Sequence, residues 1–265
     1  MRHLGLDLGG TYVKWVVLED GEVVANGRTE TNSADGPEAV IGRLIAAGRE
    51  AGRVDTVGVG VPGLFDDALG ATTFLVNIPG DWDDRPVAGP VGEALGAPAR
   101  LINDARAFAL AEWTLGAARG CDTAAFFVVG TGVGGGVVVG GALHEGREGR
   151  AGELGHFTIA PDGPRCNCGN HGCVEAFVRD AIKSNDMASA GRYLGIGICN
   201  AIVALAPDRV VVGGGVAKAG EALLAPARAE VAKRVTVSVP VEIVPAELGV
   251  LAGAIGAALR GAEPR

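Results

Sequence analysis

The chain has 265 residues, of which 48% are hydrophobic and 20% charged, and this composition excludes a disordered protein. Its formal net charge is −8 and its lysines and arginines form no cluster, which argues against a nucleic-acid partner because phosphates would meet no basic patch. The first residues lack a signal-peptide pattern and no uncharged apolar run reaches 18 residues, so we expect a cytoplasmic protein that does not contact a membrane.

The first hundred residues alternate short apolar runs with glycine turns. This pattern predicts strands at 4–8, 12–18, 22–28, 56–61 and 99–102. The Asp20-Gly21 pair between alternating apolar residues indicates a hairpin. Apolar residues at helical spacing predict helices at 37–52, 85–96 and 105–115.

A similar opening recurs in the middle of the chain. Strands are expected at 123–129, 134–139 and from 142, separated by glycine turns at 130–132 and 140–141. A further strand is expected at 209–213, and helices are expected around 195–204 and at 248–259. The repeated unit predicts an α/β protein with two related halves and a cleft, in which ligands lie at the carboxyl ends of the strands.

Two of the glycine turns are candidates for phosphate binding. Asp7-Leu8-Gly9-Gly10-Thr11 places a carboxylate beside exposed backbone amides, and Asp7 could hold Mg²⁺ through water. The matching turn contains Gly130, Thr131, Gly132 and Gly134. Neither turn is a Walker loop, because no Gly-Lys-Ser/Thr follows, and a single glycine hairpin is more often only a turn. The pair of turns, together with Gly213-Gly214-Gly215, favours a phosphate site.

Asn103 and Asp104 come directly after a predicted strand and directly before a predicted helix. A carboxylate in this place can accept the proton of a substrate hydroxyl during phosphoryl transfer. Asn and Asp are also preferred helix N-caps, and local sequence alone leaves both interpretations open.

Four residues have the spacing of a zinc site, namely His156, Cys166, Cys168 and Cys173. Three thiolates and one imidazole make a closed tetrahedral shell, which suits a structural zinc ion. The alternative is three buried, unpaired cysteines. An odd total of five cysteines favours a reducing compartment, and we expect the remaining Cys121 and Cys199 in the core.

Glu153 and Glu175 flank this cysteine cluster and have no evident structural task. Together with His156 they could accept hydrogen bonds from sugar hydroxyls, held rigidly by the metal site. Each glutamate considered alone is more often a solvated surface residue.

At this point the residues resemble the ROK family (repressors, open reading frames, kinases), most closely its bacterial glucokinase-type members. The resemblance covers nearly the whole chain and rests on motifs at 7–11, 60–63, 77–82, 101–105, 130–136, 153–156, 166–175 and 211–215. It implies an actin-like ATPase (ribonuclease-H-like) fold of two α/β domains, 1–102 plus 248–265 and 103–247, with the substrates in the interdomain cleft and a zinc knuckle in the larger domain. It also implies a homodimer or homotetramer.

The resemblance implies a role for each motif residue. Asp104 would be the base that deprotonates the 6-hydroxyl of a hexose. The other sugar hydroxyls would be held by Asn77, Asn103, Glu153, His156 and Glu175. ATP with Mg²⁺ would be bound by Asp7, Gly9, Gly10, Thr11, Lys14, Gly130, Thr131, Gly132, Gly134, Gly213, Gly214 and Gly215. Structural zinc would be bound by His156, Cys166, Cys168 and Cys173.

Two features depart from the family pattern. The stretch 176–189 is shorter than in typical members, where a longer helical segment contributes to subunit contacts. Arg106 stands where many members have a small or amide residue, and its guanidinium could lower the pKa of Asp104 or pair with substrate.

Alternative functions remain within this resemblance. A repressor would carry a helix-turn-helix ahead of the kinase-like body, whereas the first strand here is expected within a few residues of Met1. A sensor would bind sugar without turnover. The preferred sugar is glucose, with N-acetylmannosamine, N-acetylglucosamine, mannose, fructose and allose as alternatives. Polyphosphate as donor would require a basic groove, for which the net charge of −8 gives no indication.

Overall fold

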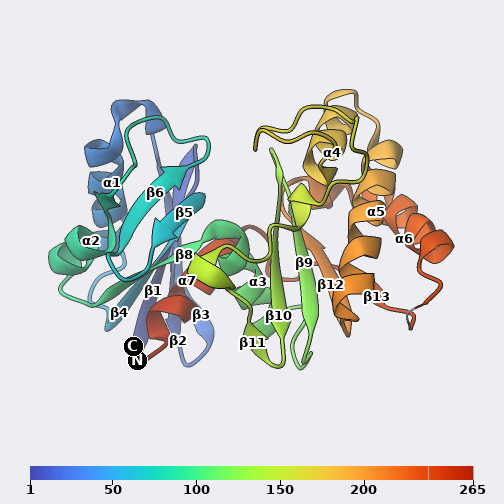
Figure 1. Cartoon of the computed structure of the whole chain (residues 1–265). Coiled ribbons are helices and arrows are strands. Elements are labelled where there is room, and N and C mark those ends of the chain that lie inside the picture. The colour runs from blue at the N-terminus through green and yellow to red at the C-terminus, as the bar shows by residue number, and fades with distance from the viewer. Residues whose placement is uncertain (238, 265) are drawn as a thin grey trace. The chain divides into compact units, whose positions relative to one another are not determined.

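The computed structural model describes residues 1–237 and 239–264, and their contacts group into two compact units (Figure 1). The first unit comprises Met1–Ala111 and the C-terminal stretch from Leu251, and the second comprises Glu112–Val250. The chain passes between the units twice, once inside helix α3 (Asp104–Thr114) and once just before helix α7 (Ala252–Ala262). Whether these units act as the functional domains expected from the sequence stays a prediction.

A five-stranded sheet in the order β3-β2-β1-β4-β8 forms the centre of the first unit. Its strands are β1 (Arg2–Leu8), β2 (Tyr12–Glu19), β3 (Glu22–Glu30), β4 (Thr56–Val61) and β8 (Ala99–Asn103). Strands β1, β2 and β3 pair antiparallel, whereas β1, β4 and β8 run parallel. The core on one side of this sheet joins Leu4, Leu6 and Val59 to Val40 and Leu44 of helix α1 (Pro37–Glu50).

The second unit repeats this topology in a sheet of order β11-β10-β9-β12-β13. Its strands are β9 (Ala124–Val129), β10 (Val133–Val139), β11 (Ala142–Leu143), β12 (Arg209–Gly213) and β13 (Glu242–Pro245). Again two antiparallel hairpins are followed by parallel strands. The duplicated α/β architecture expected from the sequence is therefore confirmed. The unit also contains helices α4 (Val174–Lys183), α5 (Met187–Leu205) and α6 (Glu221–Arg234).

Helix α7 packs directly on the sheet of the first unit because glycines on the strands leave room for its backbone. A Cβ atom at Gly58 of β4 would collide with the carbonyl oxygen of Ala257, and one at Gly5 of β1 would collide with that of Ala254. The small residues of α7, which suggested a helix at 248–259, are therefore required by this close packing.

The structure corrects the predicted bounds of two helices. The segment predicted as helix 85–96 begins with a short strand β7 (Arg85–Pro86), and helix α2 covers only Ala88–Leu95, because the N–H groups of Val87 and Ala88 donate to the carbonyl of Gly70. Strand β7 belongs to a small sheet that the sequence did not predict, with β5 (Gly63–Asp66) and β6 (Ala71–Leu75).

The helix predicted at 248–259 begins later. A 3₁₀ helix at Gly249–Leu251 precedes α7, which starts at Ala252. The N–H groups of Glu247 and Leu248 donate to the buried carboxylate of Glu112 at 3.1 and 2.8 Å, and these bonds hold the segment in a non-helical conformation.

Among the described residues one helix, α5, is long and apolar enough to cross a membrane. Half of its apolar window is buried in the second unit, where α5 packs against α4 and α6. Leu194, Ile198 and Ile202 on this helix are fully buried, and they belong to the core that also contains Phe127 and Val210 of the sheet. The apolar character of α5 is explained by this core position.

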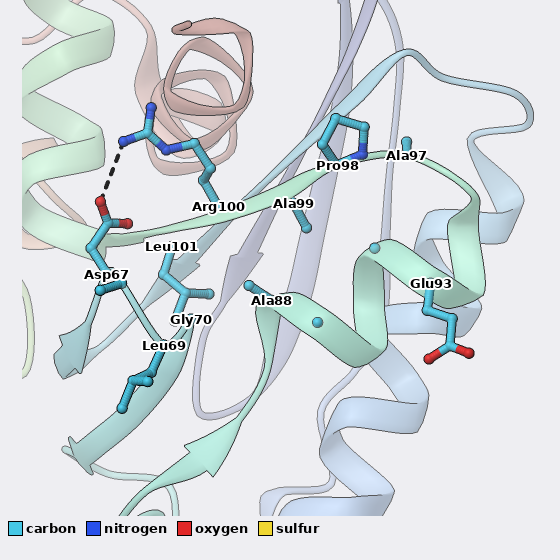
Figure 2. A pocket seen from close by; sticks show the side chains of 13 residues that line it. Asp67, Leu69, Gly70, Ala88, Glu93, Ala97, Pro98, Ala99, Arg100 and Leu101 are labelled. Carbon is cyan, nitrogen blue, oxygen red and sulfur yellow. Dashed lines mark hydrogen bonds and ion pairs between the residues drawn. The ribbon is translucent and has the colours of Figure 1, made fainter. Parts of the chain in front are cut away.

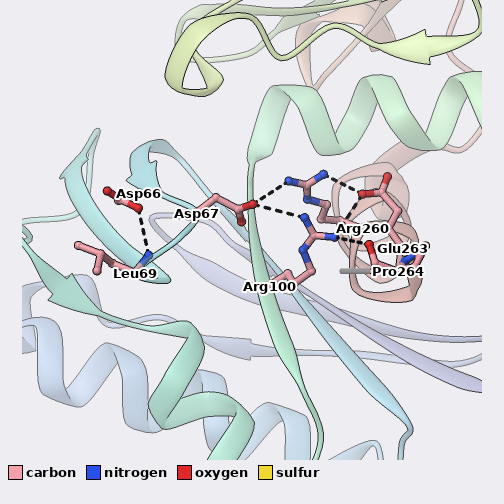
Figure 3. Close-up of polar contacts among 7 residues, drawn as sticks. All are labelled: Asp66, Asp67, Leu69, Arg100, Arg260, Glu263 and Pro264. Carbon is pink, nitrogen blue, oxygen red and sulfur yellow. Dashed lines mark hydrogen bonds and ion pairs between the residues drawn. The ribbon is translucent and has the colours of Figure 1, made fainter.

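The C-terminal end of α7 is held by a group of ion pairs (Figure 3). Asp67 accepts from Arg100 and Arg260, both at 3.3 Å, and Arg260 also donates to Glu263 at 2.7 Å. Because these residues come from the β5–β6 turn, β8 and the end of the chain, the group connects three separate segments of the first unit.

Candidate functional site

The predicted site residues of the first unit lie at the carboxyl ends of its parallel strands. Asp7 pairs in register with Gly60, and Val61 pairs with Asn103, so the ends of β1, β4 and β8 meet at one edge of the sheet. This edge is the usual place for ligands in an open α/β sheet. Parallel pairing of β1 with β4 and of β4 with β8, between strands far apart in the sequence, brings these residues together.

Asp7 is 9% exposed and accepts a hydrogen bond from Nζ of Lys14 at 3.0 Å. Gly253 of α7 lies against the same carboxyl group, since a Cβ there would be 2.9 Å from its atoms. The glycine turn between the two strands is closed by a bond from the Gly9 N–H to Tyr12 and by the Thr31 hydroxyl, which donates to the Gly9 carbonyl. The turn thus presents an acidic group, a basic group and a fixed backbone.

Asn77 lies next to this turn. Its carbonyl oxygen would be 3.2 Å from a Cβ at Gly10, so the two backbones approach closely. Asn77 also has a φ of 61°, in the left-handed region that Asn tolerates better than most residues. The structure therefore brings Asn77 to the first glycine turn, although its role as a sugar ligand stays a prediction.

Asn103, and not Asp104, has the position of the helix cap at the start of α3. Its Oδ1 accepts from the N–H groups of Ala105 and Arg106 at 3.1 and 3.2 Å, while its Nδ2 donates to the Gly63 carbonyl at 3.2 Å. The amide group of Asn103 is therefore engaged with backbone on both sides. Asp104 is the first residue of α3, and its Oδ1 accepts from the Ala105 N–H at 2.8 Å. The side chain of Arg106 is buried, as Arg106 is only 2% exposed.

The two glycine segments of the second unit lie side by side. Strands β9 and β12 are parallel neighbours, with Gly213 in register with Val128. A Cβ at Gly214, whose φ is +91°, would collide with the carbonyl of Val129, the residue just before the turn at 130–132. Glycine is therefore required at 214, and the close approach joins the predicted nucleotide-binding segments 130–136 and 213–215 at one sheet edge.

The four predicted zinc ligands form one cluster. The ligand atoms of His156, Cys166, Cys168 and Cys173 all lie within 4.8 Å of one another. The Sγ atoms of Cys168 and Cys173 are 3.8 Å apart, and Nδ1 of His156 is 3.7 Å from Sγ of Cys166. A tetrahedral ion with Zn–S bonds of about 2.3 Å separates neighbouring sulfurs by about 3.8 Å. The donor set and its spacing fit zinc.

The thiols of this cluster differ in acidity. Burial raises the pKa of Cys166 and of Cys173, and the carboxylate of Glu175 nearby adds to both effects. Burial acts in the same direction on Cys168, but hydrogen bonds from the Asn170 N–H and from the other two thiols lower its pKa overall. Metal binding would displace the protons that the raised pKa values retain.

The remaining two cysteines have different surroundings. Cys199 is 6% exposed and belongs to the hydrophobic core of the second unit, as predicted. Cys121 is only partly buried and lies near the charges of Arg209 and Asp208, so the expected core position is wrong for this residue. It precedes β9, and the N–H of the next residue, Asp122, donates to the carboxylate of Asp208 at 2.9 Å.

The segment with Glu153 and His156 packs directly on β10. A Cβ at Gly155 would collide with the Val133 carbonyl, and one at Gly135 would be 2.5 Å from the carbonyl of Gly152. His156 ends the 3₁₀ helix Leu154–His156, and Nδ1 is its ring atom that faces the cysteines. The close backbone contact fixes this segment relative to the glycine turn at 130–132.

Glu175 lies in the first turn of α4 and reaches two other parts of the unit. Its Oε2 accepts from the backbone N–H of Val133 at 3.0 Å, and its Oε1 accepts from the thiol of Cys166 at 3.3 Å. The solvated-surface interpretation therefore does not apply to this residue. Glu175 joins the cysteine cluster to the glycine segment 130–136.

Sequence reasoning missed Arg179 on α4, which supports the cysteine loop. Its guanidinium donates to the carbonyl of Arg165 at 3.1 Å and to the side chain of Asn167 at 3.5 Å, and both residues adjoin Cys166. A basic residue four positions after Glu175 on one helix face was the only available signal in the sequence.

The first unit also contains a cavity of about 590 Å³ between helix α2 and strand β8 (Figure 2). Among the described residues, those that line it include Asp67, Glu93 and Arg100 but none of the predicted site residues. Arg100 points toward Asp67, with which it forms an ion pair. The cavity is thus separate from the residues that carry the predicted chemistry.

Comparisons with known proteins agree with the resemblance. The family model described as ROK family matches residues 3–184 and 177–260. In an alignment 309 positions long, the chain is 34% identical to a glucokinase of Thermotoga maritima, and the alignment covers 97% of this chain and 96% of the other. A ROK hexokinase structure from Thermus thermophilus is 36% identical with a TM-score of 0.83, and 98% of each chain is covered. A ROK family glucokinase from Streptomyces griseus, in complex with glucose and AMPPNP, is 28% identical with a TM-score of 0.85, covering 98% of this chain and 99% of that one.

Proposed function

Since this chain belongs to the ROK family and is an ATP-dependent sugar kinase of the glucokinase type, we propose that it transfers the γ-phosphoryl group of ATP to the 6-hydroxyl of glucose. The observation that carries this proposal is the 34% identity, over nearly the full length of both chains, to a glucokinase. The fold agrees, because two sheets of the same topology each end in glycine turns suited to phosphate.

Asp104 is the proposed catalytic base. As the 6-oxygen forms its bond to the γ-phosphorus and the bond to the β-phosphate oxygen breaks, the hydroxyl proton passes to the carboxylate of Asp104. Asn103 caps α3 and bonds to Gly63, so it fixes the backbone that carries Asp104. We propose that Asn103 acts mainly through this positioning.

ATP would be held by the glycine turns of both units. In the first unit Asp7 would hold Mg²⁺ through water, and Lys14 would supply a positive charge beside Gly9, Gly10 and Thr11. In the second unit the segments 130–136 and 213–215 would offer backbone N–H groups to the phosphates and a surface to the nucleoside. Charge neutralisation and positioning would account for most of the rate acceleration.

The sugar would be bound beside the zinc knuckle. His156 belongs to the cysteine cluster, Glu153 directly precedes the 3₁₀ helix that ends at His156, and Glu175 follows Cys173 by two residues. A bound zinc ion would therefore make their positions rigid. Nδ1 of His156 faces the thiols, which leaves Nε2 as the ring atom for a sugar hydroxyl. Zinc would supply structural order in this site, and Asn77 would contribute from the first unit.

The test is ATP turnover by the zinc-loaded protein with glucose, N-acetylglucosamine, N-acetylmannosamine, mannose, fructose and allose, each also tried with polyphosphate as donor. The matched control is Asp104→Asn, which keeps the size of the side chain but removes the base. We expect the highest kcat/KM with glucose and ATP, and a loss of kcat of about 10²–10⁴-fold in the variant with glucose still bound.

Other results would select other functions. A higher kcat/KM with another sugar would overturn the assignment to glucose and keep the kinase. Glucose binding without turnover would favour the sensor. We also propose a cytoplasmic location, because the free cysteines of the described residues support a reducing compartment. We further propose a homodimer or homotetramer, for which sedimentation velocity is the direct measurement.

A further inference from the structure

Val133 is the residue at which the glycine turn 130–132 enters strand β10. It is 3% exposed, and its N–H donates to Oε2 of Glu175 at 3.0 Å. The same carboxylate oxygen lies against the α-carbon of Gly132, where any Cβ would collide with it. The carboxylate of Glu175 therefore holds the exit of the turn through one charge-assisted hydrogen bond and one close contact.

The carboxylate is itself held by a rigid element. Glu175 belongs to the first turn of α4, two residues after Cys173 of the cysteine cluster, and α4 packs against β10. The next peptide group of the chain begins with the Val133 carbonyl, which packs against Gly155. Val133 is thus fixed at its N–H by the helix of the cysteine cluster and at its carbonyl by the segment that carries Glu153 and His156.

We propose that Glu175 is a positioning residue for the glycine segment 130–136, so that this residue controls nucleotide affinity even when no sugar is present. The inference rests on the proposed function in one respect, namely that this segment binds phosphate. The N–H groups of Gly130, Thr131 and Gly132 can face one anion only if the turn has a single conformation, and the bond to Val133 sets the orientation of the peptide that ends it. Removing the acceptor leaves a buried N–H without a partner and releases the turn.

The test is the binding of ADP to the zinc-loaded protein by calorimetry, without sugar. We expect Glu175→Ala to raise the Kd of ADP about tenfold. The matched variant is Glu175→Gln, whose side-chain oxygen can still accept from Val133, and we expect its Kd within about threefold of the unaltered protein. If the alanine variant does not fold, Glu175→Asp serves instead, because it keeps the charge but shortens the side chain by one methylene.

An unchanged Kd in Glu175→Ala, or in Glu175→Asp where it replaces the alanine variant, would overturn the proposal and leave Glu175 as a sugar ligand alone. A lower Kd would also overturn it, since the carboxylate would then compete with phosphate for the Val133 N–H. Equal weakening in Glu175→Gln would also overturn it, because the charge of Glu175 and not its hydrogen bond to Val133 would then be responsible. Zinc content, measured in each variant, separates these effects from loss of the metal site.

Hydrogen exchange at the Val133 amide distinguishes this inference from the proposed function. We expect faster exchange in Glu175→Ala and exchange close to that of the unaltered protein in Glu175→Gln. If the unaltered protein binds no ADP, the proposed function fails, and the exchange rates still decide whether Glu175 holds the turn. Equal exchange in all variants would contradict the positioning role.

Discussion

Lys14 donates a hydrogen bond to Asp7 at 3.0 Å, and the two residues are direct cross-strand partners on β2 and β1. The glycine turn between them sets this register, so the ion pair follows from the length of the turn. The side chain of Asp7 is 13% exposed and that of Lys14 is 33% exposed, which means that the pair is partly removed from water. The turn therefore carries its own counter-charge beside the proposed magnesium ligand.

We expect Lys14→Met to raise the KM for ATP about tenfold and to leave the KM for sugar unchanged, because Lys14 belongs to the proposed nucleotide site and not to the proposed sugar site. The variant also leaves the Asp7 carboxylate without its partner, so the free energy of unfolding should fall by about 1–3 kcal/mol. Lys14→Arg keeps the charge and is the control. A rise in the KM for sugar alone would contradict the assignment of Lys14 to the nucleotide.

Arg179 is expected to strengthen zinc binding, although it is not a ligand. Arg179→Met removes its bonds to Arg165 and Asn167, which hold the loop before and after Cys166, and should weaken zinc affinity about tenfold in competition with a chromogenic chelator. Lys183→Met removes the same charge from an exposed position of the same helix and is the matched control. Equal affinities in the two variants would mean that the bonds to the loop have no effect on the metal.

Glu230 should make stability depend on pH on the acid side. Its hydrogen bond with Arg234 at 2.6 Å lowers its pKa, with further help from the charges of Lys233 and Arg192. A carboxyl whose pKa is lower in the folded protein stabilises it above the ordinary value of 4.5, and this contribution is lost as the pH falls through the lowered pKa.

Urea unfolding at several pH values checks this effect. At pH 7 we expect Glu230→Gln to be about 1 kcal/mol less stable than the unaltered protein, and this difference should shrink below pH 4.5. A difference that stays constant with pH would show that packing against Gly195, and not charge, accounts for the role of Glu230.

A pair of glycine substitutions tests the packing of α7. Gly58→Ala places a Cβ against the Ala257 carbonyl and should lower the free energy of unfolding by about 3 kcal/mol. Gly42→Ala, in the exposed interior of α1 where a Cβ meets no atom, should raise it by about 0.5–1 kcal/mol. Denaturant unfolding gives both values, and a small loss at Gly58 would mean that α7 shifts to accommodate the methyl group.

Much of the fold could be predicted because its signals are local. The strands of both sheets follow apolar runs bounded by glycine turns, and the same order in the two halves predicted the repeated topology that the structure confirms. The three-stranded sheet β5-β6-β7 escaped prediction, because Gly63–Asp66 and Arg85–Pro86 are too short to show alternation and become strands only by pairing with Ala71–Leu75.

The candidate site also has a part that the sequence predicted and a part that it left undecided. The spacing of His156, Cys166, Cys168 and Cys173 predicted a cluster that the structure brings within 4.8 Å, since a loop closed by three near cysteines allows few other arrangements. The sequence left open whether the Asn103-Asp104 pair is a helix cap or carries a catalytic base, because both side chains suit a cap. The structure gives the cap to Asn103, since α3 starts at Asp104, and the role of Asp104 as base stays a prediction.

By itself the sequence determined where the strands follow one another along the chain, the glycine turns after them and the types of side chain available at their ends. Only the tertiary structure decided that Glu175 reaches Val133, 42 positions away in the chain, and that Arg179 supports the cysteine loop. Local signals depend on the conformational preferences of neighbouring residues and on hydrophobic period. Contacts between distant side chains depend on how α4 packs against β10, and that packing is a property of the whole folded unit.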